Sequence, residues 1–251
     1  MSNQHTHIFP LRKSSRVEAS DVNKSGRLSL SGMAKKFQEA AWEHAAELDY
    51  GYHNLAEKQL TWVLSRMLIK IHKYPRWNRE IAVRTWPSDM DKLFFIRDFE
   101  FRNTDAHVVI AGTSSWLIVN DKGRPQIPDH ACDNIPLKKD ERSLFRNPSK
   151  IPLPTEYDRC FKVAVRYSDL DMNNHTSNVR YFAWIADCLA QKGVYEHDIS
   201  LVEMNFLKEC KLDDVLDICY SLQHDNTHVV TGINQDGKYV FAAKAGIFTK
   251  H

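Results

Sequence analysis

Four polar side chains in the second half of the chain could do acid–base chemistry. They follow one another at every second position: Asp169, Asp171, Asn173 and His175. In an extended or turning segment, side chains two residues apart point the same way, so these groups can converge. An imidazole beside carboxylates and an amide can transfer a proton or orient a water molecule.

The same cluster also fits simpler roles. Asp and Asn before a helix are typical of turns and helix caps, and a single histidine next to apolar sequence is commonly a core residue. Asp169, Asp171 and Asn173 also occupy the first, third and fifth places of an EF-hand-like calcium loop. However, Asn174 stands where that loop needs Gly, and Arg180 stands where it needs Glu, so we exclude calcium.

A helical pattern begins directly after the cluster. Its apolar residues recur at intervals of three and four: Val179, Phe182, Ala183, Ala186, Leu189 and Ala190. Thr176 or Ser177 can cap the start of this helix, and Gly193 can end it. The helix N-terminus, with N–H groups at Ser177 and Asn178, therefore lies just behind His175. It is suited to a carbonyl oxygen that gains negative charge.

Several separate blocks carry a family resemblance. They are Asp169-Leu-Asp-Met-Asn-x-His175, Asn178-x-x-Tyr-x-x-Trp184, Lys208-Glu-Cys210, Thr61-Trp-Val-Leu-Ser-Arg-Met67, Tyr74-Pro-x-Trp77 and Thr85-Trp86. In this order they resemble the acyl-acyl carrier protein thioesterases, the family that includes the plant enzymes that terminate fatty-acid chains. The resemblance runs from about Arg16 to the C-terminus. It implies a hydrolase of fatty-acid biosynthesis that acts on acyl carrier protein, with no cofactor and no metal.

The composition is that of a globular protein. The 251 residues are 43% hydrophobic and 11% aromatic, and 34 basic and 32 acidic residues nearly cancel, so no nucleic-acid partner is expected. No apolar run approaches the roughly 20 residues of a membrane span. Residues 1–10 lack the apolar stretch of a signal peptide, so we expect a cytoplasmic protein, unlike plant relatives with targeting segments. The five cysteines form no Cys-x-x-Cys pair, which favours reduced thiols.

Periodicity predicts an α+β fold with two similar halves. The first half reads as a strand over 16–21, a helix over 30–48, and strands over 60–71, 81–86, 94–102 and 107–119. The second reads as a strand over 161–166, the helix after His175, and strands over 202–210, 215–222, 228–234 and 239–248. A long helix followed by antiparallel strands is typical of a curved sheet wrapped around a helix. We therefore expect a double hot-dog fold.

The two halves align with each other when Ser20-Asp21 is placed opposite Ser168-Asp169. The residues Asp171, Asn173 and His175 then lie opposite Asn23, Ser25 and Arg27. The first copy thus has the scaffold without the titratable cluster, which predicts one active site per chain. We expect an N-terminal repeat over 1–130 that binds the acyl chain, a Pro-rich linker over 131–158 and a catalytic repeat over 159–251.

The segment between the repeats has two possible roles. Residues 125–154 hold six of the nine prolines, and we expect an ordered crossover on the surface. Its basic residues are Lys138, Lys139, Arg142, Arg146 and Lys150. They either form an ordinary exposed face or steer the acidic acyl carrier protein.

The predicted chemistry leaves two mechanisms open. His175 is the candidate acid–base, Asp171 would orient it, and Asn173 would position water or substrate. Glu209 and Cys210 are adjacent on a predicted strand, where only one of them can face the site. We favour Glu209 as general base over Cys210 as nucleophile, because a carboxylate on a half-buried strand is costly without a task, whereas a buried cysteine is ordinary core filling.

Other functions compete with this prediction. An acyl-CoA thioesterase, a hot-dog dehydratase and a non-catalytic acyl-binding hot-dog module share the expected architecture. No phosphate loop and no Gly-x-Ser-x-Gly motif is present. Two fused repeats already supply the pairing that single hot-dog chains obtain by dimerising, and a homodimer stays possible.

Overall fold

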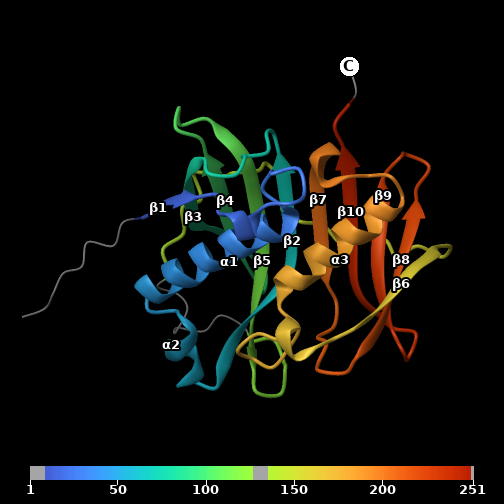
Figure 1. Ribbon diagram of the computed structural model, residues 1–251. Helices are drawn as coiled ribbons and strands as arrows, with labels where there is room; N and C mark the ends of the chain where they lie inside the picture. The colour runs from blue at the N-terminus through green and yellow to red at the C-terminus, as the bar shows by residue number, and fades with distance from the viewer. Residues whose placement is uncertain (1–8, 127–134, 250–251) are drawn as a thin grey trace, which may run out of the picture.

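In the part of the chain that the structure describes, residues 9–126 and 135–249, ten strands form one antiparallel sheet. The structure is a computed structural model, and two long helices lie along one face of its sheet (Figure 1). The strand order is β1-β3-β4-β5-β2-β7-β10-β9-β8-β6. The central pair of strands, β2 and β7, therefore joins the two halves of the chain.

The N-terminal half begins with β1 (Leu11–Arg16), η1 (Ala19–Asp21), α1 (Leu30–Glu47) and α2 (Tyr52–Ala56). It continues with β2 (Leu60–Ile71), β3 (Glu80–Asp91), β4 (Phe94–Arg102) and β5 (Val108–Asn120). The C-terminal half begins with β6 (Asp158–Ala164), η2 (Tyr167–Asp169), α3 (Asn178–Gln191) and η3 (Glu196–Asp198). It ends with β7 (Ile199–Phe206), β8 (Val215–Leu222), β9 (His228–Asn234) and β10 (Tyr239–Ile247).

These elements confirm the predicted α+β architecture and correct several strand bounds. The strand predicted over 81–86 extends to Asp91 in β3, and the strand predicted over 161–166 is shifted to Asp158–Ala164 in β6. The strand predicted over 16–21 is wrong, because β1 ends at Arg16 and a 3-10 turn follows, in which Asp21 N–H donates to Glu18 O. The strand predicted over 202–210 is also wrong at its C-terminal end, because β7 ends at Phe206. The N–H groups of Leu207 and Lys208 both donate to the carbonyl of Val240, so β7 leaves the ladder after Phe206.

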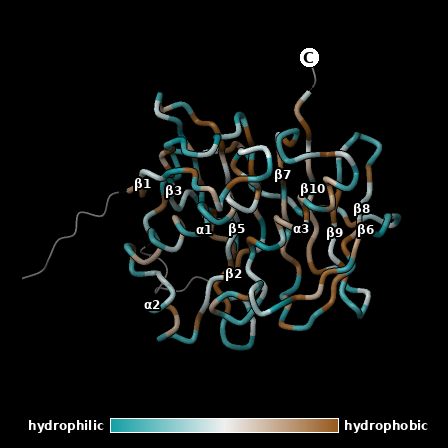
Figure 2. The backbone as a smooth tube through the Cα atoms, viewed as in Figure 1, coloured by the Kyte–Doolittle hydropathy of each residue, from teal (hydrophilic) through white to brown (hydrophobic). Residues whose placement is uncertain are grey.

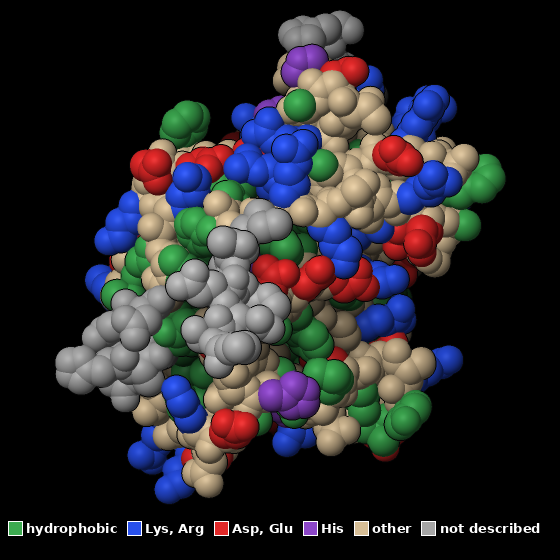
Figure 3. Space-filling view, turned by 90° about the vertical axis from the view of Figure 1, so that its left-hand side faces the viewer, with side chains coloured by type: hydrophobic (Ala, Val, Ile, Leu, Met, Phe, Trp, Pro, Cys, Tyr) green, Lys and Arg blue, Asp and Glu red, His purple; other side chains and the backbone are tan. Residues whose placement is uncertain are grey.

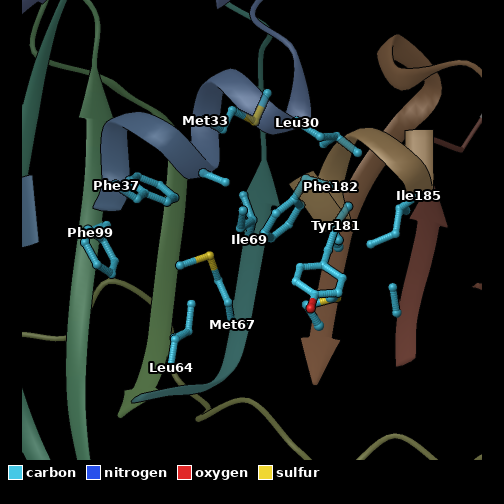
Figure 4. Close-up of a cluster of buried hydrophobic side chains, with 14 of the residues drawn as sticks. Leu30, Met33, Phe37, Leu64, Met67, Ile69, Phe99, Tyr181, Phe182 and Ile185 are labelled. Carbon is cyan, nitrogen blue, oxygen red and sulfur yellow. The ribbon is translucent and has the colours of Figure 1, made fainter. Parts of the chain in front are cut away.

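The core is continuous beneath both helices. Figure 4 shows Phe37 of α1 beside Phe99 of β4, and Phe182 of α3 near Ile69 of β2. The ring centroids of Phe37 and Phe99 are 4.6 Å apart. Gly112 of β5 allows this packing, because a Cβ there would lie 2.8 Å from the ring of Phe37. Apolar residues follow the strands and the inner helix faces, whereas the turns are hydrophilic (Figure 2).

Residues 135–157 of the segment between the repeats form a strap across the opposite face of the sheet, whereas residues 127–134 of the predicted crossover and linker lie outside the described residues. Arg142 forms an ion pair with buried Asp98 of β4 at 2.9 Å, and Arg146 forms one with buried Glu203 of β7 at 2.8 Å. Lys138 lies 3.5 Å from Glu141. These three basic side chains therefore fasten the strap to the sheet or to itself.

These ion pairs change the interpretation of the basic residues in the strap. Lys139 and Lys150 are exposed, but the basic cluster predicted for carrier docking is largely used within the protein. The face of the molecule in Figure 3 carries Lys and Arg side chains interspersed with Asp and Glu. No helix in the described ranges is long and apolar enough to cross a bilayer.

Candidate active site

A buried carboxylate organises the loop between β6 and α3. Asp169 is 4% exposed, accepts the N–H of Arg166 at 2.9 Å and forms an ion pair with Arg180 of α3 at 2.7 Å. Its backbone carbonyl accepts the N–H of Ser177 at 2.8 Å. Asp169 therefore holds both ends of the loop and sets where α3 begins, and its own carboxylate is not available for chemistry.

The next residues close a tight turn that carries the histidine. Asp171 N–H donates to the carbonyl of His175 at 2.8 Å, and Asp171 Oδ1 accepts the N–H of Asn173 at 2.8 Å. Asn174 adopts a left-handed backbone with φ of 58°, which Asn tolerates better than most residues. The carboxylate of Asp171 therefore shapes the turn, and no hydrogen bond joins it to the imidazole among the described residues.

The histidine meets a carboxylate from a distant part of the chain. His175 Nε2 lies 3.2 Å from Glu209 Oε2, and both side chains are open to solvent, at 29% and 55% exposure. Glu209 lies in the loop between β7 and β8 rather than on a strand. The two loops are joined by Thr176 N–H, which donates to the carbonyl of Cys210 at 2.8 Å.

Cys210 takes no part in this open pair. Its side chain is 1% exposed, and burial raises the pKa of its thiol to about 11. No hydrogen bond connects its sulfur to His175 in the described structure. A buried thiol with a raised pKa holds little thiolate at neutral pH and is a poor nucleophile, so the geometry favours Glu209 over Cys210.

The start of α3 offers one of the two predicted backbone donors. Ser177 N–H is already bonded to Asp169, and the Ser177 side chain makes no cap hydrogen bond. Within the described residues, the N–H groups of Asn178 and Val179 have no partner. Such unpaired groups at a helix N-terminus attract negative charge, so Asn178 remains the candidate oxyanion donor and Ser177 does not.

The first repeat contains the same loop with other side chains. Asn23 N–H donates to the carbonyl of Arg27 at 2.9 Å, and Asn23 Oδ1 accepts the N–H of Ser25 at 3.0 Å. Asp21 is buried and paired with Lys36 of α1 at 2.9 Å. Each bond has its counterpart around Asp169, Asp171 and Asn173. The predicted register between the repeats is confirmed.

In the first repeat, however, protein groups fill the equivalent site. Leu28 N–H donates to the carbonyl of Pro75 as Thr176 does to Cys210, so Tyr74 stands where the second repeat has Glu209. Tyr74 is 8% exposed and donates to the carbonyl of Ile199 at 2.9 Å.

A carboxylate also lies at the start of α1. Glu196 accepts the N–H of Leu30 at 2.8 Å and the Nδ2 of Asn23 at 2.7 Å. The corresponding positions of the second repeat are Asn178 and Asp171. The molecule thus contains its own example of an anionic oxygen held at this helix terminus.

A small pocket opens between α1, its following loop and the first half of the sheet. Its lining is apolar and aromatic apart from one charge: Ala41, Trp42, Ala45, Leu48, Tyr50, Trp62, Pro87, Phe95, Ile96, Arg97, Trp116 and Ile135. Burial lowers the pKa of Arg97 to about 10. Arg97 Nη1 contacts His44 Nδ1 at 3.0 Å and Thr85 Oγ1 at 3.2 Å.

This pocket lies at the same end of the sheet as the His175–Glu209 pair. In the β2–β7 ladder, Arg66 is opposite Asn205 and Lys70 is opposite Leu201, so the start of β2 lies beside the end of β7. His175 and Glu209 are not among the lining residues. The pocket and the pair are therefore distinct features at the same end of the sheet. No group of three or more metal-binding side chains occurs in the described residues.

Two family models match this chain. The model described as acyl-ACP thioesterase N-terminal domain matches residues 11–135, and the model described as acyl-ACP thioesterase C-terminal domain matches residues 154–245. The chain belongs to the acyl-ACP thioesterase family. Its match to both models confirms the family predicted from the sequence blocks.

Two plant members of the family illustrate the similarity. The oleoyl-acyl carrier protein thioesterase of Coriandrum sativum is 26% identical over 231 residues, which cover 84% of this chain and 62% of that protein. A palmitoyl-acyl carrier protein thioesterase of Arabidopsis thaliana is 28% identical over 224 residues, which cover 82% of this chain and 53% of that protein. The chain spans 60–65% of the length of the first oleoyl-acyl carrier protein relatives.

Solved structures of similar proteins support the fold. An acyl-ACP thioesterase from Bacteroides thetaiotaomicron matches with a TM-score of 0.85 and 24% identity over 95% of this chain and 97% of its own. A 12:0-ACP thioesterase from Umbellularia californica matches with a TM-score of 0.79 and 22% identity over 96% and 97% of the two chains. These likenesses confirm the double hot-dog architecture.

Arg97 is the feature of this region that the sequence prediction missed. The predicted strand over 94–102 alternates, and its inward positions are Phe95, Arg97, Phe99 and Phe101. A charged residue in a row of aromatic residues that face the core is the available signal, because a half-buried cation is costly without a purpose.

Proposed function

We propose that this protein hydrolyses the thioester of fatty acyl chains bound to acyl carrier protein and releases free fatty acid. The observation that carries this proposal is the 3.2 Å contact between His175 Nε2 and Glu209 Oε2. The pair lies in front of α3, whose N–H groups at Asn178 and Val179 have no partner in the described part of the chain. Family membership supports the same reaction class.

In the proposed mechanism, water is the nucleophile. Glu209 accepts a proton from a water molecule as its oxygen attacks the thioester carbonyl, and Asn178 N–H stabilises the oxygen that becomes negative. His175 then donates a proton to the departing thiolate and takes up from Glu209, across their 3.2 Å contact, the proton that Glu209 removed from water, so both groups return to their starting states. Asp171 holds the turn that carries His175, and the exposed Asn173 side chain positions water or the pantetheine arm. In the first repeat, Glu196 bound to Leu30 N–H supports the role given to Asn178.

The acyl chain is proposed to enter the pocket of the N-terminal repeat. Its apolar lining suits a hydrocarbon chain, and it lies at the same end of the sheet as the proposed catalytic pair. This agrees with the predicted division of work, in which the first repeat binds and the second one reacts. Arg97 at the wall would limit how far an unsubstituted chain can advance, because desolvating a guanidinium against hydrocarbon is unfavourable.

A thiol-release assay tests the reaction. Purified protein is given one acyl group on acyl carrier protein or on CoA, and free thiol is measured over time. We expect release that is lost in His175→Ala and retained in His224→Ala, since His224 is exposed in the turn between β8 and β9. Release equal in wild type and His175→Ala would reject the mechanism, and no release at all would favour the acyl-binding module.

The carrier is decided by comparing kcat/KM for the two substrates. We expect acyl carrier protein to be preferred; a higher value for acyl-CoA would assign the protein to the alternative thioesterase class. We also propose that the reaction takes place in the cytoplasm, a reducing compartment; the four described cysteines are free thiols in the structure. The possible homodimer stays a prediction, which sedimentation at working concentration tests.

A further inference from the structure

Two cysteine side chains meet where β6 packs under the C-terminal part of α3. Cys160 Sγ lies 3.0 Å from Cys188 Sγ. The pairing of β6 with β8 shifts between Arg159 and Phe161, and such a bulge redirects the side chain of the extra residue. As a result, both Cys160 and Phe161 pack against the core. The contact between the two sulfurs is therefore built into the strand geometry.

The surroundings give the two thiols different access to solvent. Cys188 is fully buried, and burial raises the pKa of its thiol, whereas Cys160 is partly exposed. A dissolved oxidant therefore reaches Cys160 first. The helix end is already held to the strand by Lys192 Nζ and Asp158 Oδ2, which are 2.9 Å apart, so a covalent link would need little movement of either element.

We propose that Cys160 and Cys188 form a reversible disulfide that tethers the catalytic segment of the second repeat. The whole loop with Asp171 and His175, together with the start of α3, lies between these two cysteines. A bond between them closes that segment into a covalent ring. Formation of this disulfide does not depend on the proposed thioesterase function. Only the effect of the disulfide on turnover rests on that function.

The reaction balances with hydrogen peroxide as oxidant. The Cys160 thiolate attacks one peroxide oxygen, the O–O bond breaks, and a sulfenic acid and one water form. The Cys188 thiol then attacks the sulfenic sulfur, so that an S–S bond forms, the S–O bond breaks and a second water leaves. The two thiols together lose two protons and two electrons, and the peroxide is reduced to two waters. A dithiol reductant reverses the change.

The bond is expected to stabilise rather than distort the site. Cross-linking removes conformational freedom from the unfolded chain between the two cysteines. We therefore expect oxidation to raise the thermal midpoint by about 5–10 °C. Because the two sulfurs are already in contact, we expect kcat/KM to change by no more than about twofold.

Peptide mapping and thermal unfolding of the full chain test this proposal. The protein is titrated with hydrogen peroxide, its remaining thiols are blocked, and its peptides are identified by mass spectrometry without reduction. We expect a cross-linked peptide that joins Cys160 to Cys188, a raised midpoint, and reversal of both by dithiothreitol. Cys160→Ser should abolish the link and the rise, whereas the matched variant Cys219→Ser, in β8, should keep both.

Three results would overturn the proposal. They are oxidation of Cys160 to a sulfinic acid with Cys188 still free, a link from Cys160 to Cys219 instead, or a midpoint that does not rise when the expected link forms. None of these readouts needs turnover, so a failure here is distinct from a failure of the proposed hydrolase function. A link that forms in a protein without thioesterase activity would leave this inference intact and reject only the function.

Discussion

Replacing Glu209 by Gln is the most direct perturbation of the proposed mechanism. The substitution keeps the size of the side chain but removes its ability to accept a proton from water. Glu209 is 55% exposed, and among the described residues its ion-pair contact is with His175, so we expect the free energy of unfolding to change by no more than about 0.5 kcal/mol. Loss of a general base costs about 10²–10⁴ in kcat, which corresponds to about 3–5 kcal/mol of activation free energy.

Steady-state thiol release on an acyl carrier protein substrate measures this loss. We expect kcat to fall in Glu209→Gln with little change in KM, because the carboxylate acts in the chemical step. Two matched variants separate loss of the general base from loss of any exposed carboxylate and from loss of the Cys210 thiol. Glu39→Gln removes a carboxylate of similar exposure on α1 and should be neutral, and Cys210→Ala should keep kcat within about tenfold while lowering stability. Normal turnover in Glu209→Gln together with loss in Cys210→Ala would refute the water mechanism and reinstate the cysteine nucleophile.

Three further predictions concern the packing of the core, the ion pair of the strap and the pocket. Gly112→Ala should lower the free energy of unfolding by about 1–3 kcal/mol, measured with urea, because its Cβ would clash with the ring of Phe37 at 2.8 Å. Burial alone would raise the pKa of Glu203, but the hydrogen bonds from Arg146 and the strap outweigh it and hold the pKa below 4.5. That stabilisation is present at neutral pH and lost as the pH falls through the folded-state pKa, so Arg146→Ala should cost about 1–3 kcal/mol at pH 7 and progressively less as the pH falls below 4.5. Ala45→Phe should narrow the pocket and lower kcat/KM for long acyl chains more than for medium ones.

Each of these predictions has an outcome that contradicts it. Gly246→Ala serves as the control for Gly112→Ala, because the nearest atom to its Cβ would be 3.8 Å away; equal losses in the two variants would remove the packing argument. A pH-independent cost of Arg146→Ala would show that the ion pair with Glu203 is not the source of stability. An equal fall for all chain lengths in Ala45→Phe would place the acyl chain elsewhere.

Much of the fold follows from local patterns in the sequence. The bounds of β2, β4, β8 and β9 agree with the predicted strands because each is an uninterrupted β-rich run that ends at turn residues. The prediction for β7 failed because backbone groups make non-local bonds. The end of β7 depends on Val240 in β10, which accepts from both Leu207 and Lys208, and nothing in the local pattern reveals that carbonyl.

The sequence predicted which residue types form the candidate site, but not the contacts that bring them together. The alternation of Asp169, Asp171, Asn173 and His175 marked the loop, and the repeat alignment assigned the cluster to one half. The meeting of His175 with Glu209 required the bond between Thr176 and the Cys210 carbonyl, which joins two distant segments. Likewise, the loss of Ser177 as a donor follows from its bond to Asp169, which residue types alone do not indicate.

The two repeats explain why one scaffold can hold one proposed site and one closed site. Both loops have the same backbone bonds, so the turn does not by itself create reactivity. The two helix N-termini differ in their partners. The carboxylate of Glu196 accepts the N–H of Leu30 at the start of α1, whereas no group among the described residues accepts the N–H of Asn178 at the start of α3. Tyr74 is turned inward where Glu209 is exposed. Replacing Arg27 with histidine would therefore not create a second active site. Glu196 already occupies the N-terminus of α1, and Tyr74 stands where a carboxylate equivalent to Glu209 would be needed to activate water.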